Sequence, residues 1–595
     1  MMANIEKRVC QNCKKGFMIE PDDFGFYEKI KVPPPTFCPD CRMIRRMSCR
    51  NLRNFYRGKC NAPGHSENII SVYSSDKKNK VYDHKYWWSG EWNLFNYGIE
   101  YNFLKTFFEQ FFELYHSFPQ LNFSNVMAVN SEYCNMTIKS KNCYFLFSGN
   151  ESENCMFSES LIKMKDCCDI LIGYKSELCY ESINCNNSFK LIFSLDCNNC
   201  VDSAFLTDCN NCQNCFGCWN LRNKKYMIFN QQYIKDEYYK ITSGLFSGKY
   251  SEIVIIKNKL KKEAKPIKRY SQIIHSQNVT GDDILNSKNC FSCFDIRNSE
   301  DSKNIWRILG GGAINHDITV AVKPELGYEG SGIGNSYNSL MCVALDSGKY
   351  LTYCQYCLSN CSNCFGCVGL RNKSYCILNK QYTKEQYEEL VPKIIKHMND
   401  MPYVDKKGRI YKYGEFFPSE LSPFCYNETI AQEYFPLTKE QALEQGYKWK
   451  DREERNYEIE IKNKDIPDDI KDVKDDIVGK IIECEHKGKC NEQCTEALKI
   501  IENELQFYRR MNLPLPHLCP NYRHYQRLKQ RNPLKLWHRT CMCDKTNHFN
   551  HKGSCDVEFE TSYAPIDRRL YIVRSVISRR FIRNKNYTSF LLSLN

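Results

Sequence analysis

The stretch from 143 to 226 divides without gaps into seven blocks of twelve residues: CYFLFSGNESEN, CMFSESLIKMKD, CCDILIGYKSEL, CYESINCNNSFK, LIFSLDCNNCVD, SAFLTDCNNCQN and CFGCWNLRNKKY. The first, fourth, seventh and tenth positions of the blocks are mostly small or apolar. Two columns of cysteine result, one formed by Cys143, Cys155, Cys167 and Cys179 and the other by Cys185, Cys197 and Cys209. Columns of one residue type at a fixed period are typical of a solenoid whose coils stack on one another. We therefore predict a tight β-solenoid with twelve-residue coils that point every third residue inward.

A second block further along the chain keeps the same three-residue period, beginning at Cys290 and Cys293. The segment from Cys361 to Lys373 repeats the segment from Cys212 to Lys224 at an offset of 149 residues. Helical patterns follow both blocks, and stacked repeats need such caps to cover their last coil. The sequence predicts solenoids at 120–232 and 276–382, helical caps at 233–275 and 383–449, and a charged linker at 450–480.

The chain holds 36 cysteines, and those of the solenoids allow two interpretations. In the first, the inward thiols of a protein in a reducing cell are simply compact, apolar core residues. In the second, thiols of successive coils bind a row of metal ions, a metal ladder. We favour packing, while the closely spaced run that starts at Cys209 and ends at Cys218 leaves metal binding open. The coil geometry resembles the tight β-helix of insect antifreeze proteins, but the threonine rows with which those proteins bind ice are absent here.

The N-terminal region carries a different cysteine pattern. Two C-x-x-C pairs, Cys10 with Cys13 and Cys38 with Cys41, are separated by 24 residues. Four thiolates in paired knuckles can close a tetrahedral Zn²⁺ site that keeps no open position, which is typical of a structural site. We predict a zinc-binding module over residues 1–100.

The C-terminal region repeats this module imperfectly. A shift of 481 residues aligns Cys13 with Cys494, Cys38 with Cys519 and Cys60 with Cys541. Tyr522 stands where the fourth thiolate belongs, so Cys484, His486 or His517 would have to complete the site. The candidate metal ligands over 481–565 are Cys490, Cys494 and Cys519, followed by a second cluster of Cys541, Cys543, His548 and Cys555. We expect a poorly ordered tail at 566–595.

Basic residues follow Cys41 without an intervening acid and at helical spacing, so they share one face. They are Arg42, Arg46, Arg50, Arg53 and Arg57, and Arg523, Arg527 and Arg531 repeat the first three. Such a stripe can track a phosphate backbone or can be a solvated helix face. The repetition moves the balance slightly towards nucleic acid.

The segments VCQNCKKGF, FGFYEKIKVPPPTFCPDCR and NCFGCVGLRNKSYCILNKQY resemble an uncharacterised multi-module zinc-ribbon family of small-genome bacteria and large DNA viruses. The resemblance extends over nearly the whole chain. It implies zinc binding and supplies no activity.

Composition and motifs narrow the function classes. The 595 residues carry a formal charge of +13, no apolar run long enough for a bilayer span and no targeting signal, so we expect a cytoplasmic, intracellular protein without a membrane partner. No G-x-S-x-G, H-E-x-x-H or P-loop string occurs. We predict a zinc-binding, non-enzymatic scaffold that contacts nucleic acid or a ribonucleoprotein through the basic helices and proteins through the solenoid faces. The alternative is an enzyme with one reactive cysteine in a groove between solenoid and cap, and the oligomeric state stays open.

Overall fold

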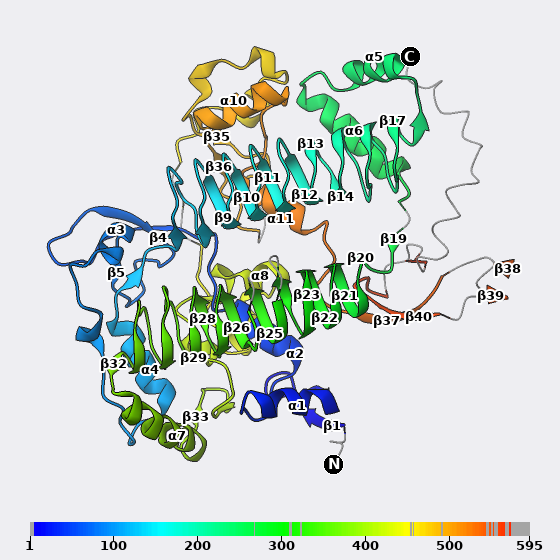
Figure 1. The fold of residues 1–595 in the computed structure, drawn as a ribbon. Helices are drawn as coiled ribbons and strands as arrows, with labels where there is room; N and C mark the ends of the chain where they lie inside the picture. Colours follow the sequence, from blue (N-terminus) through cyan, green and yellow to red (C-terminus); the bar gives the residue numbers. More distant parts are fainter. Residues whose placement is uncertain are drawn as a thin grey trace. The chain divides into compact units, whose positions relative to one another are not determined.

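The computed structural model of the chain is shown in Figure 1. It describes residues 5–266, 268–308, 312–321, 324–452, 455, 457–488, 492–542, 547–548, 551–552, 557–565 and 571–572. The predicted tail at 566–595 lies outside these residues, apart from 571–572. No helix within the described ranges combines the length and the apolar character that a membrane crossing requires.

The chain forms two compact units that are interleaved along the sequence. The first unit comprises Met1–Asn122, Lys268–Asp451 and Pro533–Asn595, and the second comprises Phe123–Ile267 and Arg452–Asn532. Each unit therefore contains one solenoid and one cysteine-bearing module. The N-terminal module belongs with the second solenoid, and the module at 481–532 belongs with the first solenoid.

The solenoid of the second unit is a sheet of parallel strands with the predicted twelve-residue period, ending in an antiparallel pairing of its last two strands. Met156 pairs with Cys168, and Cys168 pairs with Tyr180. Its strands are β7 (Asn125–Val126), β8 (Thr137–Ile138), β9 (Tyr144–Asn150), β10 (Met156–Ile162), β11 (Cys168–Tyr174), β12 (Tyr180–Asn186), β13 (Phe189–Ile192), β14 (Leu195–Asn198), β15 (Val201–Ala204), β16 (Gln213–Phe216), β17 (Lys225–Ile228) and β18 (Gln231–Gln232). The unit also contains α5 (Lys235–Leu245), α6 (Tyr250–Glu263), β35 (Ile482–Glu483), β36 (Ala497–Leu498), α10 (Glu502–Met511) and α11 (Pro520–Leu528). The prediction of a β-solenoid is confirmed.

The first unit contains the other solenoid and the N-terminal module. The solenoid strands are β20 (Ile273–Ile274), β21 (Gln277–Leu285), β22 (Lys288–Arg297), β23 (Ser299–Lys303), β24 (Trp306–Ile308), β25 (Gly312–Ala321), β26 (Tyr328–Ile333), β27 (Tyr337–Leu340), β28 (Val343–Leu345), β29 (Lys349–Thr352), β30 (Ser362–Phe365), β31 (Ser374–Ile377) and β32 (Lys380–Gln381). The N-terminal elements are β1 (Glu6–Val9), β2 (Gly16–Ile19), α1 (Pro21–Lys29), α2 (Pro39–Met47), β3 (Tyr56–Lys59), β4 (Asn68–Ser71), β5 (Val81–Tyr82), α3 (His84–Trp88), α4 (Phe107–Ser117) and β6 (Gln120–Leu121). The remaining elements are β19 (Lys268–Arg269), α7 (Lys384–Asp400), β33 (Tyr403–Val404), β34 (Ile410–Tyr411), α8 (Ile430–Tyr434), α9 (Lys439–Glu444), β37 (Trp537–Thr540), β38 (Asn547–His548), β39 (His551–Lys552), β40 (Glu558–Thr561) and β41 (Tyr571–Ile572).

Left-handed backbone at every third residue bends the coils. Asn142, Phe145, Ser148 and Glu151 have φ of 52°, 51°, 55° and 49°, and each immediately precedes an inward-pointing position. A coil thus has four three-residue sides. Asparagine and aspartate tolerate this conformation best among residues with a side chain, which explains the abundance of Asn at the corners.

The corner asparagines are also joined from coil to coil. The Asn142 amide donates to Asn154 Oδ1 at 3.2 Å, and the Asn154 amide donates to Asp166 Oδ1 at 2.7 Å. Each bond links residues twelve apart in sequence, so it stabilises the predicted register.

The inward cysteines are small core residues whose thiols donate hydrogen bonds to backbone carbonyl oxygens. Cys155 is fully buried, and its thiol donates to the carbonyl oxygen of Glu153 at 3.3 Å. Ser158, another inward residue, likewise donates to the carbonyl oxygen of Met156 at 2.7 Å. Burial raises the pKa of the Cys155, Cys167 and Cys185 thiols, which keeps them protonated. In the described ranges no solenoid sulfur belongs to a group of three metal-ligand atoms within 4.8 Å of one another, which supports packing over a metal ladder.

We expect Cys155→Ser to fold and to lower the free energy of unfolding by only about 1 kcal/mol, because the hydroxyl can reach the same carbonyl oxygen. Cys155→Leu should cost about 1–3 kcal/mol, because two further carbons must be fitted into a position that is already fully buried. Urea denaturation of both variants measures the difference. Loss of bound metal in Cys155→Ser would contradict the packing role.

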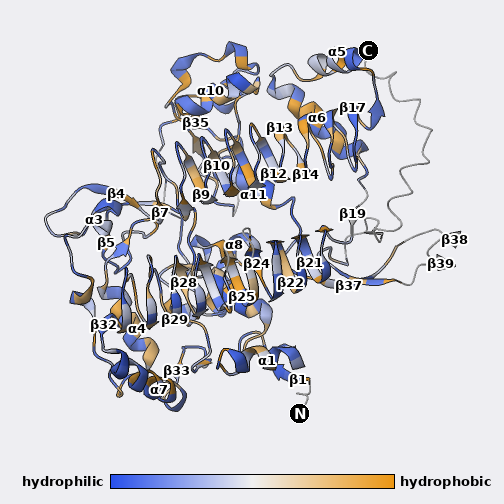
Figure 2. Ribbon diagram, in the orientation of Figure 1, coloured by the Kyte–Doolittle hydropathy of each residue, from blue (hydrophilic) through white to orange (hydrophobic). Residues whose placement is uncertain are grey.

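Helices cover each solenoid beyond its last coil. Tyr238 of α5 contacts Tyr226 with ring centroids 5.8 Å apart. Helix α6 runs along the side, because Lys257 pairs with Glu181 at 3.0 Å while Lys259 lies over the Phe229 ring. Figure 2 shows hydrophobic residues within α6, in agreement with the burial of Ile253 and Ile256.

Candidate metal centres and their docking helices

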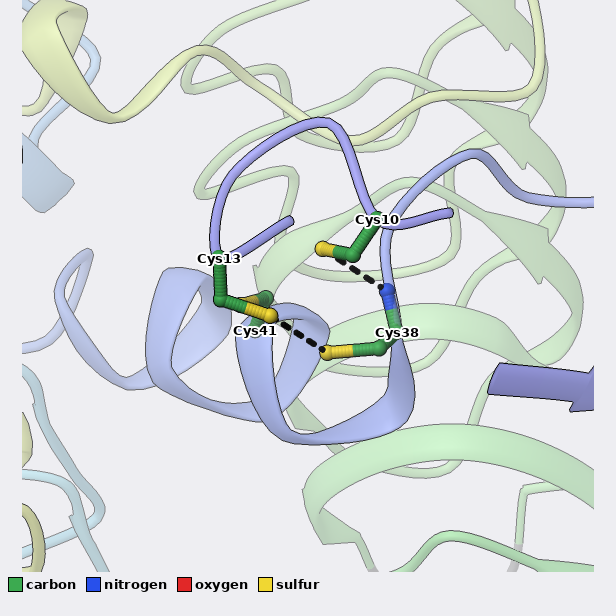
Figure 3. Close-up of side chains that lie close together, drawn as sticks. All are labelled: Cys10, Cys13, Cys38 and Cys41. Carbon is green, nitrogen blue, oxygen red and sulfur yellow. Dashed lines mark hydrogen bonds between the residues drawn. The ribbon is translucent and has the colours of Figure 1, made fainter. Parts of the chain in front are cut away.

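The four N-terminal cysteines come together at the predicted site. One hairpin turn between β1 and β2 supplies Cys10 and Cys13, whereas Cys38 is the N-cap of α2 and Cys41 lies in its first turn. All four sulfur atoms lie within 4.8 Å of one another (Figure 3), and Cys13 Sγ is 3.6 Å from Cys38 Sγ. These residues can hold one metal ion.

Backbone and amide donors point at the sulfurs of this cluster. The Cys38 N–H donates to Cys10 Sγ at 3.3 Å, and the Asn12 side-chain amide donates to Cys41 Sγ at 3.4 Å. Such donors stabilise thiolates and orient them as metal ligands. Cys10 is fully buried, and Cys38 and Cys41 are 8% and 7% exposed. Four-thiolate sites without an open position are typical of structural rather than catalytic metal ions.

The C-terminal module brings three cysteines together in the same arrangement. Cys494 Sγ lies 3.7 Å from both Cys484 Sγ and Cys519 Sγ. The Cys519 N–H donates to Cys484 Sγ at 3.2 Å, as the Cys38 N–H does to Cys10 Sγ. Cys484 therefore occupies the place of Cys10. Nine residues separate it from Cys494, against two between Cys10 and Cys13.

The structure selects among the three ligands that the sequence left open. His517 Nδ1 lies 3.0 Å from Asn463 Oδ1, and its ring stacks on Tyr250. The ring of His486 stacks on Tyr522 at 4.1 Å between centroids. Cys484 is the one that joins Cys494 and Cys519.

Several predicted ligands fall outside the described residues. They are Cys490, Cys543, Cys555 and the side chain of His548. Cys541 is described: it is buried, and its N–H donates to the carbonyl oxygen of Val557 at 2.8 Å.

The prediction that the basic stripe faces a phosphate backbone needs correction, because most of its side chains are buried. The exposed fractions are Arg42 2%, Arg46 0%, Arg50 4%, Arg53 8%, Arg523 5% and Arg527 1%. Arg57 is exposed and Arg531 is half-buried. In each unit the first two arginines of the stripe pack onto a solenoid, where Arg42 and Arg46, and likewise Arg523 and Arg527, pair with buried carboxylates.

Helix α2 docks on β25 and β26 through buried ion pairs. Arg42 makes a bidentate pair with Asp317, with Nε–Oδ1 and Nη2–Oδ2 distances of 3.0 and 2.9 Å. Arg46 lies 3.4 Å from both Asp317 and Glu329. Arg45, which the stripe did not include, lies 2.5 Å from Glu329 and 3.2 Å from Glu415. Three arginines thus meet three carboxylates.

The two solenoid carboxylates occupy one column. Asp317 and Glu329 are twelve residues apart and sit at left-handed corners, with φ of 53° and 48°. Burial alone would raise the pKa of Asp317, but Arg42 and Arg46 outweigh it and hold this pKa below its usual value. An acid pair at the coil period is the sequence signal that could have identified the docking partner.

Helix α11 docks on the solenoid of the second unit with equivalent residues. Arg523 Nε and Arg527 Nη1 lie 3.0 and 2.9 Å from the carboxylate of Asp169. His524 Nε2 is 3.7 Å from Glu159. Because Arg523 and Arg527 correspond to Arg42 and Arg46, the repetition of the stripe reflects repeated docking.

Glu504 makes the stability of the second unit sensitive to pH. Burial raises its pKa to about 7, against the opposing effects of Arg523 and of the Tyr508 hydroxyl, while Asp169 raises it further. The Glu504 carboxyl has a pKa near 4.5 in the unfolded chain and about 7 in the folded one. Its contribution to stability is therefore fully present below pH 4.5 and is lost as the pH rises to 7. The loss amounts to about 3 kcal/mol.

Glu504→Gln should therefore flatten the pH dependence of unfolding between about pH 4.5 and 7. The amide still accepts the Tyr508 hydroxyl, which donates to Glu504 at 2.7 Å in the wild type. Urea midpoints measured at several pH values check this. An unchanged slope would contradict the raised pKa.

Two pockets of the described residues lack the features of a catalytic site. An open depression of 420 Å³ is lined by His275, Ser276, Gln277, Asn286, Ser287 and Lys288, and so offers neither a cysteine nor a carboxylate. A smaller, more enclosed pocket includes Cys49 in its lining, but burial raises the pKa of this thiol to about 12, which keeps it protonated. Neither pocket supplies the activated nucleophile that the enzyme alternative requires.

Comparison with known proteins assigns neither a family nor a function to the chain. The chain matches no protein-family profile, and no curated protein sequence matches it.

Proposed function

We propose that this protein is a zinc-stabilised, non-enzymatic scaffold. The observation that carries the proposal is the closed four-cysteine cluster at the start of α2, whose arginines then enter the solenoid. The ion would fix the start of the helix, and the helix would hold the solenoid face. Metal binding thereby contributes to folding and leaves no open position for a substrate.

The sulfur spacing supports zinc. A tetrahedron of Zn–S bonds of about 2.3 Å has S···S edges of about 3.8 Å. The separations of 3.6 Å between Cys13 Sγ and Cys38 Sγ and of 3.7 Å between Cys484 Sγ and Cys494 Sγ are close to this value. The resemblance to zinc-ribbon proteins favours the same ion, and cysteines at metal-ligand spacing favour an intracellular location.

The solenoid faces support the scaffold role. Charges on exposed columns pair from coil to coil, as Lys141 does with Glu153 at 3.1 Å and Lys163 with Glu151 at 3.5 Å. Coils locked by such pairs and by the Asn bonds offer a regular polar surface suited to a protein partner. The buried arginines do not support nucleic-acid binding through the stripe.

Thiol labelling of the native, zinc-loaded protein tests the proposal against the enzyme alternative. We expect slow alkylation of every cysteine, since ligand thiolates are bound to zinc and solenoid thiols are buried away from the reagent. Metal analysis of the same sample should find zinc that Cys13→Ser removes from the N-terminal cluster. A single rapidly alkylated cysteine would favour an enzyme, and zinc-free protein with the native fold would overturn the structural role.

A further inference from the structure

The hairpin β3–β4 with helix α3 repeats the geometry of the two cysteine knuckles. Cys60 follows β3 as Cys10 follows β1, and its N–H donates to the carbonyl oxygen of Glu67 across the turn. The Cys10 N–H makes the same kind of bond to the carbonyl oxygen of Lys15. Cys60 is 3% exposed.

The start of the following helix completes the likeness. In both cysteine modules the N-cap residue of a helix donates its N–H to the sulfur of the first ligand, at 3.3 Å for Cys38 and 3.2 Å for Cys519. Asp83, the N-cap of α3, donates its N–H to Cys60 Sγ at 3.3 Å. The Cys60 sulfur is therefore held as the metal-ligating sulfurs are.

Two further ligand types converge on this sulfur. A ring nitrogen of His65, a carboxylate oxygen of Glu67 and Cys60 Sγ all lie within 4.8 Å of one another. His65 Nδ1 is 2.8 Å from Glu67 Oε1, and the His65 ring packs beside Tyr86 at 4.7 Å between centroids. These contacts fix the imidazole next to the thiol.

We propose that Cys60, His65 and Glu67 form a third metal site that binds a divalent transition ion such as Zn²⁺ or Co²⁺. One thiolate, one imidazole and one carboxylate are ligands that these ions accept, whereas Mg²⁺ and Ca²⁺ prefer oxygen. The His65 and Glu67 side chains are 34% and 47% exposed, so the site is open to solvent, unlike the cluster at Cys10. A water or a ligand of a partner can occupy the fourth position.

Cobalt titration of the full-length, zinc-loaded protein tests this site. Bound Co²⁺ is measured after desalting, released Zn²⁺ is measured in the same sample, and the thiolate-to-cobalt absorption reports sulfur ligation. We expect the wild type to hold one more metal ion, counting bound Co²⁺ and retained Zn²⁺ together, than Cys60→Ser holds. His65→Gln should weaken Co²⁺ binding by more than about 100-fold, since losing a ligand costs more than losing a supporting hydrogen bond. Cys60→Ser should abolish the absorption.

His116→Gln is the matched control, because His116 is an exposed histidine of the same unit outside the metal-ligand groups of the described residues. It should bind Co²⁺ as the wild type does. His65→Gln changes an exposed side chain and so keeps the fold, which circular dichroism verifies. Equal Co²⁺ binding by His65→Gln and wild type, or equal total metal in Cys60→Ser and wild type, would overturn the site. The zinc retained at Cys10, Cys13, Cys38 and Cys41 reports separately on the proposed function.

Discussion

Cys38→Ser should strip the metal from the N-terminal cluster and cost the first unit more than about 5 kcal/mol of folding free energy. Structural zinc contributes apparent binding free energies of about 10–16 kcal/mol in small modules. Cys38 is both a ligand and the N-cap of α2, so its loss also releases the start of the helix that carries Arg42, Arg45 and Arg46. A loss of this size approaches the whole stability of a typical domain.

Thermal unfolding and metal analysis of this variant give the result directly. Cys425→Ser is the matched control, because Cys425 is 7% exposed and caps a short helix of the same unit without joining a metal-ligand group of the described chain. It should retain the metal and unfold close to the wild-type temperature. Equal metal content in Cys38→Ser and Cys425→Ser would refute a metal site at this cluster.

Asp317→Asn should destabilise the first unit by about 3–5 kcal/mol. The substitution leaves Arg42 and Arg46 buried with one carboxylate fewer. The desolvation free energy of their charges is then no longer offset by the attraction to Asp317. The carboxamide has nearly the same volume, so packing changes little. Urea denaturation measures the loss.

Glu153→Gln is the control for Asp317→Asn, because it breaks an ion pair whose Lys141 and Glu153 side chains are 59% and 40% exposed. Exposed pairs contribute about 0–1 kcal/mol. A similar cost for both substitutions would mean that the α2 contacts do not hold the module on the solenoid. Salt should weaken the exposed pair and leave the buried one nearly unchanged.

The coil period and the first cysteine cluster could be predicted from the sequence because their signals are regular or local. Cysteines at twelve-residue spacing indicate stacked coils, and two C-x-x-C pairs indicate a closed metal site. The left-handed corners could also have been anticipated from the asparagines that precede inward positions.

The docking of the modules could not be predicted in the same way. Arg42 and Asp317 lie 275 residues apart, and although Asp317 and Glu329 repeat at the coil period, nothing in the sequence connects that acid pair to the arginines. Helical spacing placed the arginines on one face correctly, but it cannot tell whether that face meets solvent, phosphate or carboxylate. Likewise, the longer turn between Cys484 and Cys494 displaced a ligand from the aligned position and left three candidates.

The interleaving of the two units has a consequence for how the protein is made. When the N-terminal module has been synthesised, Asp317 and Glu329 have not. The arginines of α2 are therefore made before the carboxylates with which they pair. The interval is longer for the first solenoid, because its docking helix α11 (Pro520–Leu528) is synthesised much later than its strands. Because long-range pairing of this kind delays completion, both units finish late in translation, and early metal capture by Cys10, Cys13, Cys38 and Cys41 would protect the waiting module from misfolding.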